Sequence, residues 1–123
     1  MSAVMTMTQD TFDGLLTGTP TPILVDFWAE GCAPCQALTP LLDRLAAQDV
    51  DRLRVGTVRL DDNPALAARF EIRTLPTLIL FINARPTTRL TGIRSFDELD
   101  QKVQASLGGN GRRLCTGNVS DLV

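Results

Sequence analysis

The sequence contains no histidine and no tyrosine, and it has only one tryptophan, Trp28, and one lysine, Lys102. Without histidine, the chain has no imidazole to act as a general base or as a metal ligand. No apolar run approaches the roughly 20 residues of a membrane-spanning helix. Residues 1–8 also lack the basic segment and apolar core of a secretory signal. We therefore expect a cytoplasmic protein with no membrane partner.

The length of 123 residues fits one domain, which can bury a core without a disulfide or a metal to hold it together. The net charge of −2 and the hydrophobic content of 44% are ordinary for a globular protein and indicate no nucleic-acid partner. The glycine-rich run that begins at Gly108 interrupts the last helical pattern. We expect a monomer in which residues 1–107 form the domain and residues 108–123 form a flexible tail.

Three cysteines are present, and two of them, Cys32 and Cys35, are separated by only two residues. In a reducing compartment such a pair is more often catalytic or metal-binding than structural. Zinc normally requires four cysteine or histidine ligands, and this chain offers three cysteines. We therefore expect no metal and no bound cofactor, while a purely structural disulfide remains an alternative. Cys115 lies in the expected tail and is either an unused exposed thiol or a regulatory one.

Hydrophobic periodicity predicts an α/β fold with a mixed sheet of about five strands and helices on both faces. Strands that helices separate are expected to run parallel, and a turn at residues 83–86 makes the last two strands antiparallel. Thr8 and Asn63 are predicted to cap helices, and Ser95 and Glu98 form the pattern of a capping box. Strands are predicted at residues 3–7, 23–28, 53–60, 77–82 and 88–92, and helices at residues 8–16, 34–48, from 64 and 95–107.

Cys32 and Cys35 lie where a predicted buried strand gives way to a predicted helix. A thiolate at a helix start meets unpaired backbone N–H groups and the positive end of the helix dipole. This placement lowers a thiol pKa from about 8.5 into the range of roughly 3.5–7.5. Because the thiolate is the form that attacks disulfides, the strand-then-helix context predicts a redox-active pair.

Four motifs together make the chain resemble the thioredoxin family over roughly residues 3–107. They are Val25-Asp26-Phe27-Trp28-Ala29-Glu30, Cys32-x-Pro34-Cys35, Asp61-x-Asn63-Pro64 and Leu75-Pro76-Thr77. The resemblance implies the thioredoxin fold and a protein-disulfide reductase that cycles between dithiol and disulfide forms. It also implies disulfide-containing client proteins and a flavoprotein thioredoxin reductase, which would carry the FAD and NADPH.

The order of the two thiols predicts different roles for them. Cys32 is nearer the helix start and is expected to be the more exposed, so it would attack a client disulfide. Cys35 lies inside the first turn and would resolve the resulting mixed disulfide. Asp26 is a charged residue in an apolar strand, so burial should raise its pKa and suit it to exchange a proton with Cys35. An alternative interpretation is a buried, hydrogen-bonded acid with no catalytic task.

The resemblance also implies a substrate-binding surface around the thiols. Pro76 resembles the family's cis-proline, which exposes the backbone of Leu75 to an extended substrate segment; the alternative is a trans-proline that ends a loop. Trp28 would shield the thiols, although a core aromatic is the simpler interpretation. The expected substrate-binding set is Trp28, Gly31, Ala33, Pro34, Leu75, Pro76 and Gly92.

Three positions depart from the family pattern. The family usually has Trp before the first cysteine and Gly after it, where this chain has Gly31 and Ala33. A buried Lys near the carboxylate is replaced by Thr57, which should make Asp26 harder to ionise; Arg59, on the same strand face, is the alternative cation. The missing Trp favours a second hypothesis, a binding module or a redox partner dedicated to one client.

Overall fold

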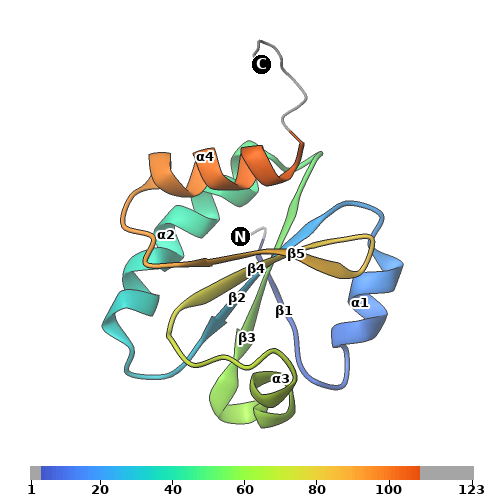
Figure 1. Cartoon of the computed structure of the whole chain (residues 1–123), viewed down its shortest axis with the longest axis vertical. Coiled ribbons are helices and arrows are strands. Elements are labelled where there is room, and N and C mark those ends of the chain that lie inside the picture. Colours follow the sequence, from blue (N-terminus) through green and yellow to red (C-terminus); the bar gives the residue numbers. More distant parts are fainter. Residues whose placement is uncertain (1–3, 109–123) are drawn as a thin grey trace.

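The structure is a computed structural model that describes residues 4–108 (Figure 1). Within these residues, five strands alternate for the most part with four α-helices, and there is one short 3-10 helix. Their bounds are β1 (Val4–Thr6), α1 (Phe12–Gly18), β2 (Ile23–Trp28), α2 (Ala33–Gln48), β3 (Arg54–Arg59), η1 (Leu60–Asp62), α3 (Pro64–Arg69), β4 (Thr77–Ile82), β5 (Arg85–Thr91) and α4 (Phe96–Ser106). The predicted order of strands and helices is confirmed.

The strands form one sheet in the order β1-β3-β2-β4-β5. Strand β3 pairs in parallel with β1 and β2, whereas β4 is antiparallel to both β2 and β5. The predicted mixed sheet is therefore confirmed, but the prediction that helix-separated strands run parallel is wrong for β4. Helix α3 has six residues and spans only about 9 Å. It lies at the end of the sheet where β3 stops, so β4 starts from that end and runs back (Figure 1).

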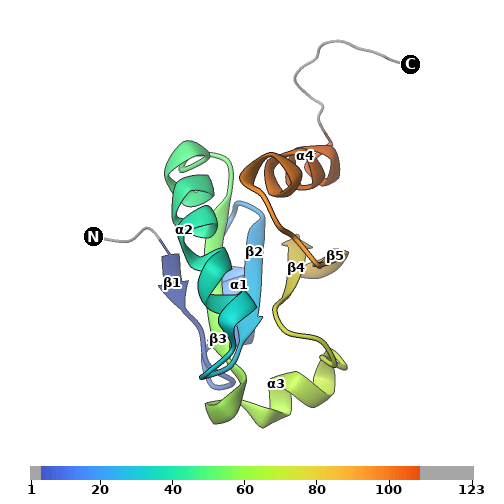
Figure 2. The ribbon, with the colours of Figure 1, turned by 90° about the vertical axis from the view of Figure 1, so that its left-hand side faces the viewer.

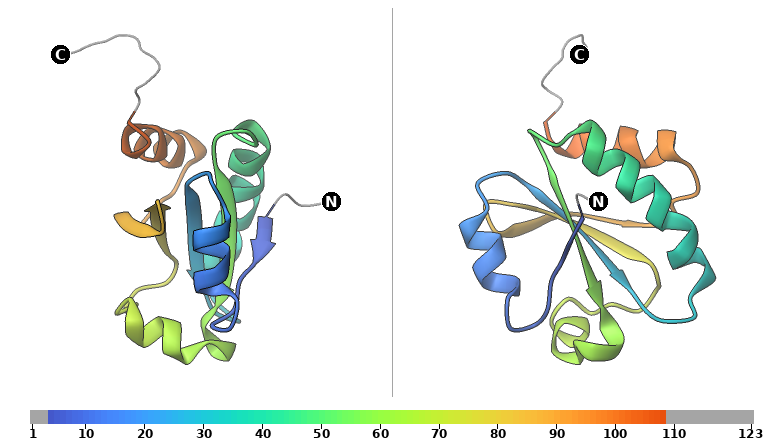
Figure 3. Two further views of the ribbon diagram at one scale, coloured as in Figure 1. Left: turned by 90° about the vertical axis from the view of Figure 1, so that its right-hand side faces the viewer. Right: turned by 180° about the vertical axis from the view of Figure 1, so that it is seen from behind.

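Helices cover both faces of the sheet, as predicted. Helices α2 and α4 pack on one face, over a core that includes Leu24, Leu42 and Leu99. Helices α1 and α3 cover the other face, where Phe12 and Phe27 are fully buried. Figure 2 shows α2 in front of the sheet and α1 behind it, and the left panel of Figure 3 shows the reverse. Strand β2 is buried on both faces, which explains its nearly unbroken apolar sequence.

Helix α1 begins at Phe12, so the predicted start with Thr8 as its cap is wrong. Residues 8–11 form a separate turn in which the Thr8 N–H donates to Thr11 Oγ1 at 3.0 Å. The Thr8 hydroxyl lies 3.2 Å from the Thr11 hydroxyl. Each threonine side chain is therefore engaged within the turn, and neither supplies a cap to the helix.

Asn63 occupies the N-cap position of α3 as predicted, but its side chain does not cap the helix. Its Nδ2 instead donates to the Arg59 carbonyl at 2.8 Å, and its Oδ1 accepts from the Gln9 N–H at 2.9 Å. Asn63 is buried, with 4% of its surface exposed. Its side chain therefore joins the end of β3 to the segment that follows β1.

The capping box of α4 is confirmed in part. The Glu98 N–H donates to Ser95 Oγ at 3.2 Å, which is the predicted cap. The Glu98 carboxylate accepts from the Arg94 N–H at 3.1 Å, whereas a capping box would have it accept from the Ser95 N–H. The two bonds together fix the entry of the chain into α4.

The last two strands meet in a tighter hairpin than the sequence predicts. Strand β5 begins at Arg85 instead of Thr88, because Arg85 already pairs with Ile82. The turn consists of Asn83 and Ala84 alone, with φ values of 54° and 66°. Two successive positive φ values are the geometry of a two-residue hairpin that matches the twist of the strands.

Candidate active site

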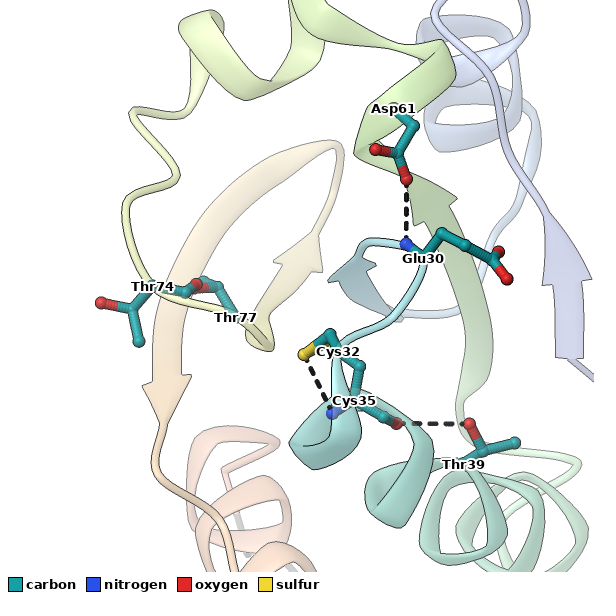
Figure 4. The surroundings of a disulfide bond; sticks show 7 residues. All are labelled: Glu30, Cys32, Cys35, Thr39, Asp61, Thr74 and Thr77. Carbon is teal, nitrogen blue, oxygen red and sulfur yellow. Dashed lines mark hydrogen bonds between the residues drawn. A yellow bond between two sulfur atoms is a disulfide. The ribbon is translucent and has the colours of Figure 1, made fainter.

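Cys32 and Cys35 form a disulfide at the start of α2, with their Cα atoms 5.2 Å apart. Cys32 is the N-cap residue of the helix, and its Sγ accepts a hydrogen bond from the Cys35 N–H at 3.2 Å (Figure 4). Cys32 is half-buried, whereas only 2% of Cys35 is exposed. The predicted difference in exposure is confirmed, and a reagent or client in solvent meets the Cys32 sulfur first.

The loop before the disulfide has a conformation that requires glycine. Gly31 has a φ of +78°, a value that residues with a side chain rarely adopt. The Cys32 N–H reaches back to the Ala29 carbonyl at 3.4 Å, which closes a tight turn. In this turn a tryptophan at position 31 would be strained. After the turn, Ala33 and Pro34 are exposed in the first turn of α2, where a missing N–H is tolerated.

Asp61, in η1 directly after β3, forms a hydrogen bond with this loop. Its Oδ2 accepts from the Glu30 N–H at 2.9 Å (Figure 4). Asp61 belongs to one of the motifs read from the sequence, but sequence reasoning assigned it no role. The parallel pairing of β2 with β3 could have indicated this contact, because it brings the carboxyl ends of both strands to the same end of the sheet.

The alternative that Arg59 serves as the cation near Asp26, in place of the lysine that Thr57 replaces, is wrong. Its guanidinium forms ion pairs with Glu30 at 3.4 Å and Asp62 at 2.9 Å, and it approaches Asp61 at 3.5 Å. These acidic partners raise the pKa of Arg59, with the hydrogen bond to Asp62 as the largest cause. The cation is therefore held at the end of the sheet by exposed carboxylates.

Asp26 is buried in β2, with 3% of its surface exposed. It pairs in register with Thr57 of β3 and Leu78 of β4, both uncharged. Its Oδ1 is buried and has no hydrogen-bond partner among residues 4–108. Burial raises the pKa of Asp26 from 3.8 to about 7. The predicted rise is confirmed, whereas the alternative of a fully hydrogen-bonded buried acid does not hold for Oδ1.

Asp26 and Cys35 line the same cavity of about 430 Å³, together with Thr57 and Trp28. Trp28 is half-buried at the end of β2, and the Arg59 guanidinium carbon lies 5.9 Å from its ring centroid. The structure therefore brings the buried acid and the buried sulfur to one space. Cys32, by contrast, is not among the residues that line this cavity.

The Leu75–Pro76 peptide bond is cis, which confirms the prediction and excludes the trans alternative. Both residues are half-buried, and their loop lies in the surroundings of the disulfide, between Thr74 and Thr77 (Figure 4). Thr77 pairs with Thr91, so the exposed Gly92 that follows Thr91 lies at the same end of the sheet as this loop.

The sequence model of the thioredoxin family matches residues 3–105. The chain belongs to the thioredoxin family. Its Cys32–Cys35 pair has the arrangement of a Cys-x-x-Cys active site, and the protein is a thiol-disulfide oxidoreductase. The architecture described above is accordingly the thioredoxin fold.

Curated relatives agree with this assignment over most of their length. The chain is 37% identical to a thioredoxin of Alicyclobacillus acidocaldarius over 82% of this chain and 95% of the relative. It is 40% identical to a thioredoxin of Mycolicibacterium smegmatis, over 76% and 85% respectively. It is 34% identical to thioredoxin 1 of a Nostoc species over 87% of this chain and all of the relative.

Several expectations concern features outside the site. Cys115 and residues 109–123 of the expected tail lie outside the described residues. Within residues 4–108, no helix is both long and apolar enough to cross a membrane. In that same range, no group of three or more histidine, cysteine, aspartate or glutamate side chains is placed to hold a metal ion.

Proposed function

We propose that this thioredoxin-family protein acts as a reductant, in which the Cys32 thiolate attacks a disulfide of a client protein. The first step forms a mixed disulfide between Cys32 and one client sulfur, and the other client sulfur leaves as a thiolate. Cys35 then loses its proton and attacks Cys32 Sγ, which releases the second client thiolate. The client gains two electrons and the Cys32–Cys35 disulfide forms.

One observation carries this proposal: the half-buried Cys32 at the helix N-cap is bonded to the buried Cys35, whose sulfur can attack Cys32 Sγ and release a client sulfur from it. The Cys35 N–H points at Cys32 Sγ at 3.2 Å, so negative charge on that sulfur would be stabilised. The helix dipole acts in the same direction. The exposure of the two residues supports attack through Cys32 and resolution through Cys35.

Asp26 is proposed to carry the proton of Cys35. With a pKa of about 7, the carboxyl is protonated in part of the molecules and ionised in the rest near neutral pH. It can therefore act either as an acid or as a base. Its ionised form would accept the Cys35 proton in the resolving step. Its protonated form would return that proton when the disulfide is reduced again. The cavity that both residues line supports this assignment.

The client is proposed to lie across the end of the sheet at which β2 and β5 stop. The proposed contacts combine the exposed active-site loop with the loop that contains the cis-proline. The full set is Trp28, Gly31, Ala33, Pro34, Leu75, Pro76 and Gly92. An extended client segment would pair with the Leu75 backbone there.

The partner that regenerates the dithiol is proposed to be a flavoprotein thioredoxin reductase, which holds the FAD and NADPH. The protein would work as a monomer. It would work in the cytoplasm, because a dithiol reductant needs a reducing compartment. This proposal rests on the family to which the chain belongs.

A second candidate is an oxidoreductase that serves a single client. The left-handed φ of Gly31 favours this candidate, because the aromatic side chain that usually precedes the first cysteine is absent and would be strained in this conformation. Without that apolar surface, affinity for unrelated disulfides should fall. A client with its own complementary surface would compensate.

An insulin-reduction assay with dithiothreitol as electron source tests general reductase activity. Wild-type protein should accelerate precipitation of the insulin chains, and Cys32→Ser should abolish the acceleration. A Cys35→Ser variant should accumulate a mixed disulfide with insulin, which non-reducing electrophoresis detects. Wild-type activity no greater than that of Cys32→Ser would refute general reductase activity and leave the single-client candidate.

A further inference from the structure

A groove lies beside the active-site loop, between α2 and the segment that connects β5 to α4. The described residues that line it are Pro34, Ala37, Leu38, Leu41, Ile93 and Arg94. Figure 1 shows the connecting segment beside α2. Two residues of the proposed client-binding set adjoin the groove, since Pro34 lines it and Gly92 directly precedes Ile93. The groove therefore continues the surface that a client would already contact.

The walls of the groove are apolar. The four lining residues of α2 have the spacing of a single helical face. Leu38 is buried, whereas Leu41 and Ile93 pack against the core and stay half-buried, so part of each side chain faces the groove. The volume of about 250 Å³ is below the roughly 300–1,000 Å³ of a site for a drug-sized ligand. An apolar side chain of a bound polypeptide therefore fits the groove better than a whole small molecule.

Two arginines give the groove a basic rim. Arg94 is exposed and lines the groove, and Arg44 lies on the same face of α2, one turn beyond Leu41. The Arg44 guanidinium carbon lies 3.8 Å from the ring centroid of Phe96, at the start of α4. Glu98 accepts from the Arg94 backbone N–H at 3.1 Å, but within residues 4–108 neither guanidinium forms an ion pair. The charge of this rim is therefore open to an acidic partner.

The length of the groove determines which residues of a client would reach it. Pro34 and Leu41 are seven residues apart on α2, which is about 10 Å along the helix axis. Two residues of an extended segment span about 7 Å and four span about 13 Å, and alternate side chains face the same side. A segment that leaves the client cysteine along α2 therefore places its second side chain in the groove and its fourth at the basic rim.

We propose that the groove selects clients that have an apolar residue two positions, and an acidic residue four positions, from the cysteine that Cys32 attacks. The apolar side chain lies between Leu41 and Ile93, and the carboxylate pairs with the Arg94 guanidinium. Arg94 is then a specificity-determining residue that takes no part in the sulfur chemistry. This inference rests on the proposed reductase function, because it describes the clients of that same site.

Rates of reduction of short, disulfide-linked peptide dimers test the inference. Each peptide contains Cys-Gly-Leu-Gly-X or its reverse, where X is glutamate, glutamine or lysine. Reduced full-length protein is mixed with each dimer without another reductant, and acid-quenched products are separated by chromatography. We expect the glutamate peptide to react about two- to fivefold faster than the glutamine peptide, as an exposed ion pair allows, and the lysine peptide to react slowest. An ionic strength of about 1 M should largely remove these differences.

A charge-reversal variant assigns the preference to the groove. Arg94→Glu should reverse the order, so that the lysine peptide reacts faster than the glutamate peptide. The matched control Arg85→Glu reverses the charge of an exposed arginine at the other end of β5 and should keep the wild-type order. Replacement of the peptide leucine by serine tests the apolar contact and should slow the glutamate peptide a few fold. An equal rate for the serine peptide would overturn the apolar part of the proposal.

The remaining outcomes separate this inference from the reductase proposal. Equal wild-type rates for the three peptides would overturn the inference and leave the groove to a partner other than the client, while the reductase proposal stands. A wild-type order in Arg94→Glu, with unchanged circular dichroism, would overturn the role of Arg94. If no peptide is reduced, the inference falls, and the insulin assay shows whether the reductase proposal falls with it.

Discussion

Asp26 is a carboxyl group on a strand that is otherwise apolar and buried on both faces. Among residues 4–108 no cation is paired with it, since Thr57 and Leu78 flank it and Arg59 is engaged with Glu30 and Asp62. Desolvation therefore governs its ionisation, and the pKa rises to about 7. The same residue is thus a source of instability at high pH and a suitable proton carrier at neutral pH.

Asp26→Asn should stabilise the oxidised protein at pH 8 but not at pH 4. The unfolded carboxyl has a pKa of 3.8 and the folded one about 7, so the folded state holds the proton more tightly. The free energy of unfolding of the wild type therefore falls as the pH rises between these values, by at most about 4 kcal/mol. Urea denaturation of both proteins at the two pH values measures this. A difference between them that does not change with pH would contradict the raised pKa.

Asp26→Asn should also slow insulin reduction at neutral pH while the circular dichroism stays unchanged. The amide cannot accept the Cys35 proton, so the resolving step loses its base. The loss expected from removing a positioned general base is about 10²-fold or more in that step. Stopped-flow measurement of mixed-disulfide decay isolates it. An unchanged decay rate would remove Asp26 from the mechanism.

Gly31→Ala should destabilise the protein by about 1 kcal/mol, because alanine is strained at a φ of +78°. Gly14 provides a matched control, since it lies in α1 with a negative φ and no atom within 4 Å of an added Cβ. Gly14→Ala should stabilise by about 0.5–1 kcal/mol. Thermal denaturation compares the two variants. Equal effects would show that the Gly31 conformation does not restrict the loop.

At the scale of elements, the start of α2 determines the chemistry. The helix places Cys32 at its N-cap and Cys35 in its first turn, so one sulfur is half-exposed and the other is buried. The sequence predicted this helix well, because strand periodicity ends at Trp28 and Pro34 is typical of a first turn. It predicted caps less well, since the Thr8 side chain bonds within its own turn and the Asn63 side chain bonds to the end of β3.

Ser95→Ala should lower the free energy of unfolding by about 1 kcal/mol, because the Glu98 N–H at the start of α4 loses its side-chain acceptor. Ser95→Asp is the matched control, since aspartate can accept the same bond and favours the positive helix end. It should retain wild-type stability. Urea denaturation at pH 7 compares the variants, and an equal loss in both would show that the side-chain cap contributes nothing.

At the scale of the whole molecule, the fold brings together groups from strand β2, the start of α2 and the loop before β4. The residues that recur in family motifs, Cys32, Cys35, Asp26 and Pro76, could be named from the sequence, and the cis bond and the raised pKa follow that prediction. The antiparallel direction of β4 could not be predicted from the sequence, because it depends on where α3 lies in space. The hydrogen bond from the Glu30 N–H to Asp61 and the ion pairs of Arg59 depend on the register of β2 with β3, which a single sequence does not give.

The fold is expected to prime the Cys32 sulfur for attack, and alkylation kinetics measure this directly. In a Cys35→Ser, Cys115→Ser variant, Cys32 is the only thiol, and its alkylation by iodoacetamide can be followed from pH 4 to pH 10. We expect a midpoint well below the ordinary value of about 8.5, within roughly 3.5–7.5. The midpoint should return to about 8.5 when the protein is unfolded in guanidinium. A midpoint near 8.5 in the folded protein would contradict it.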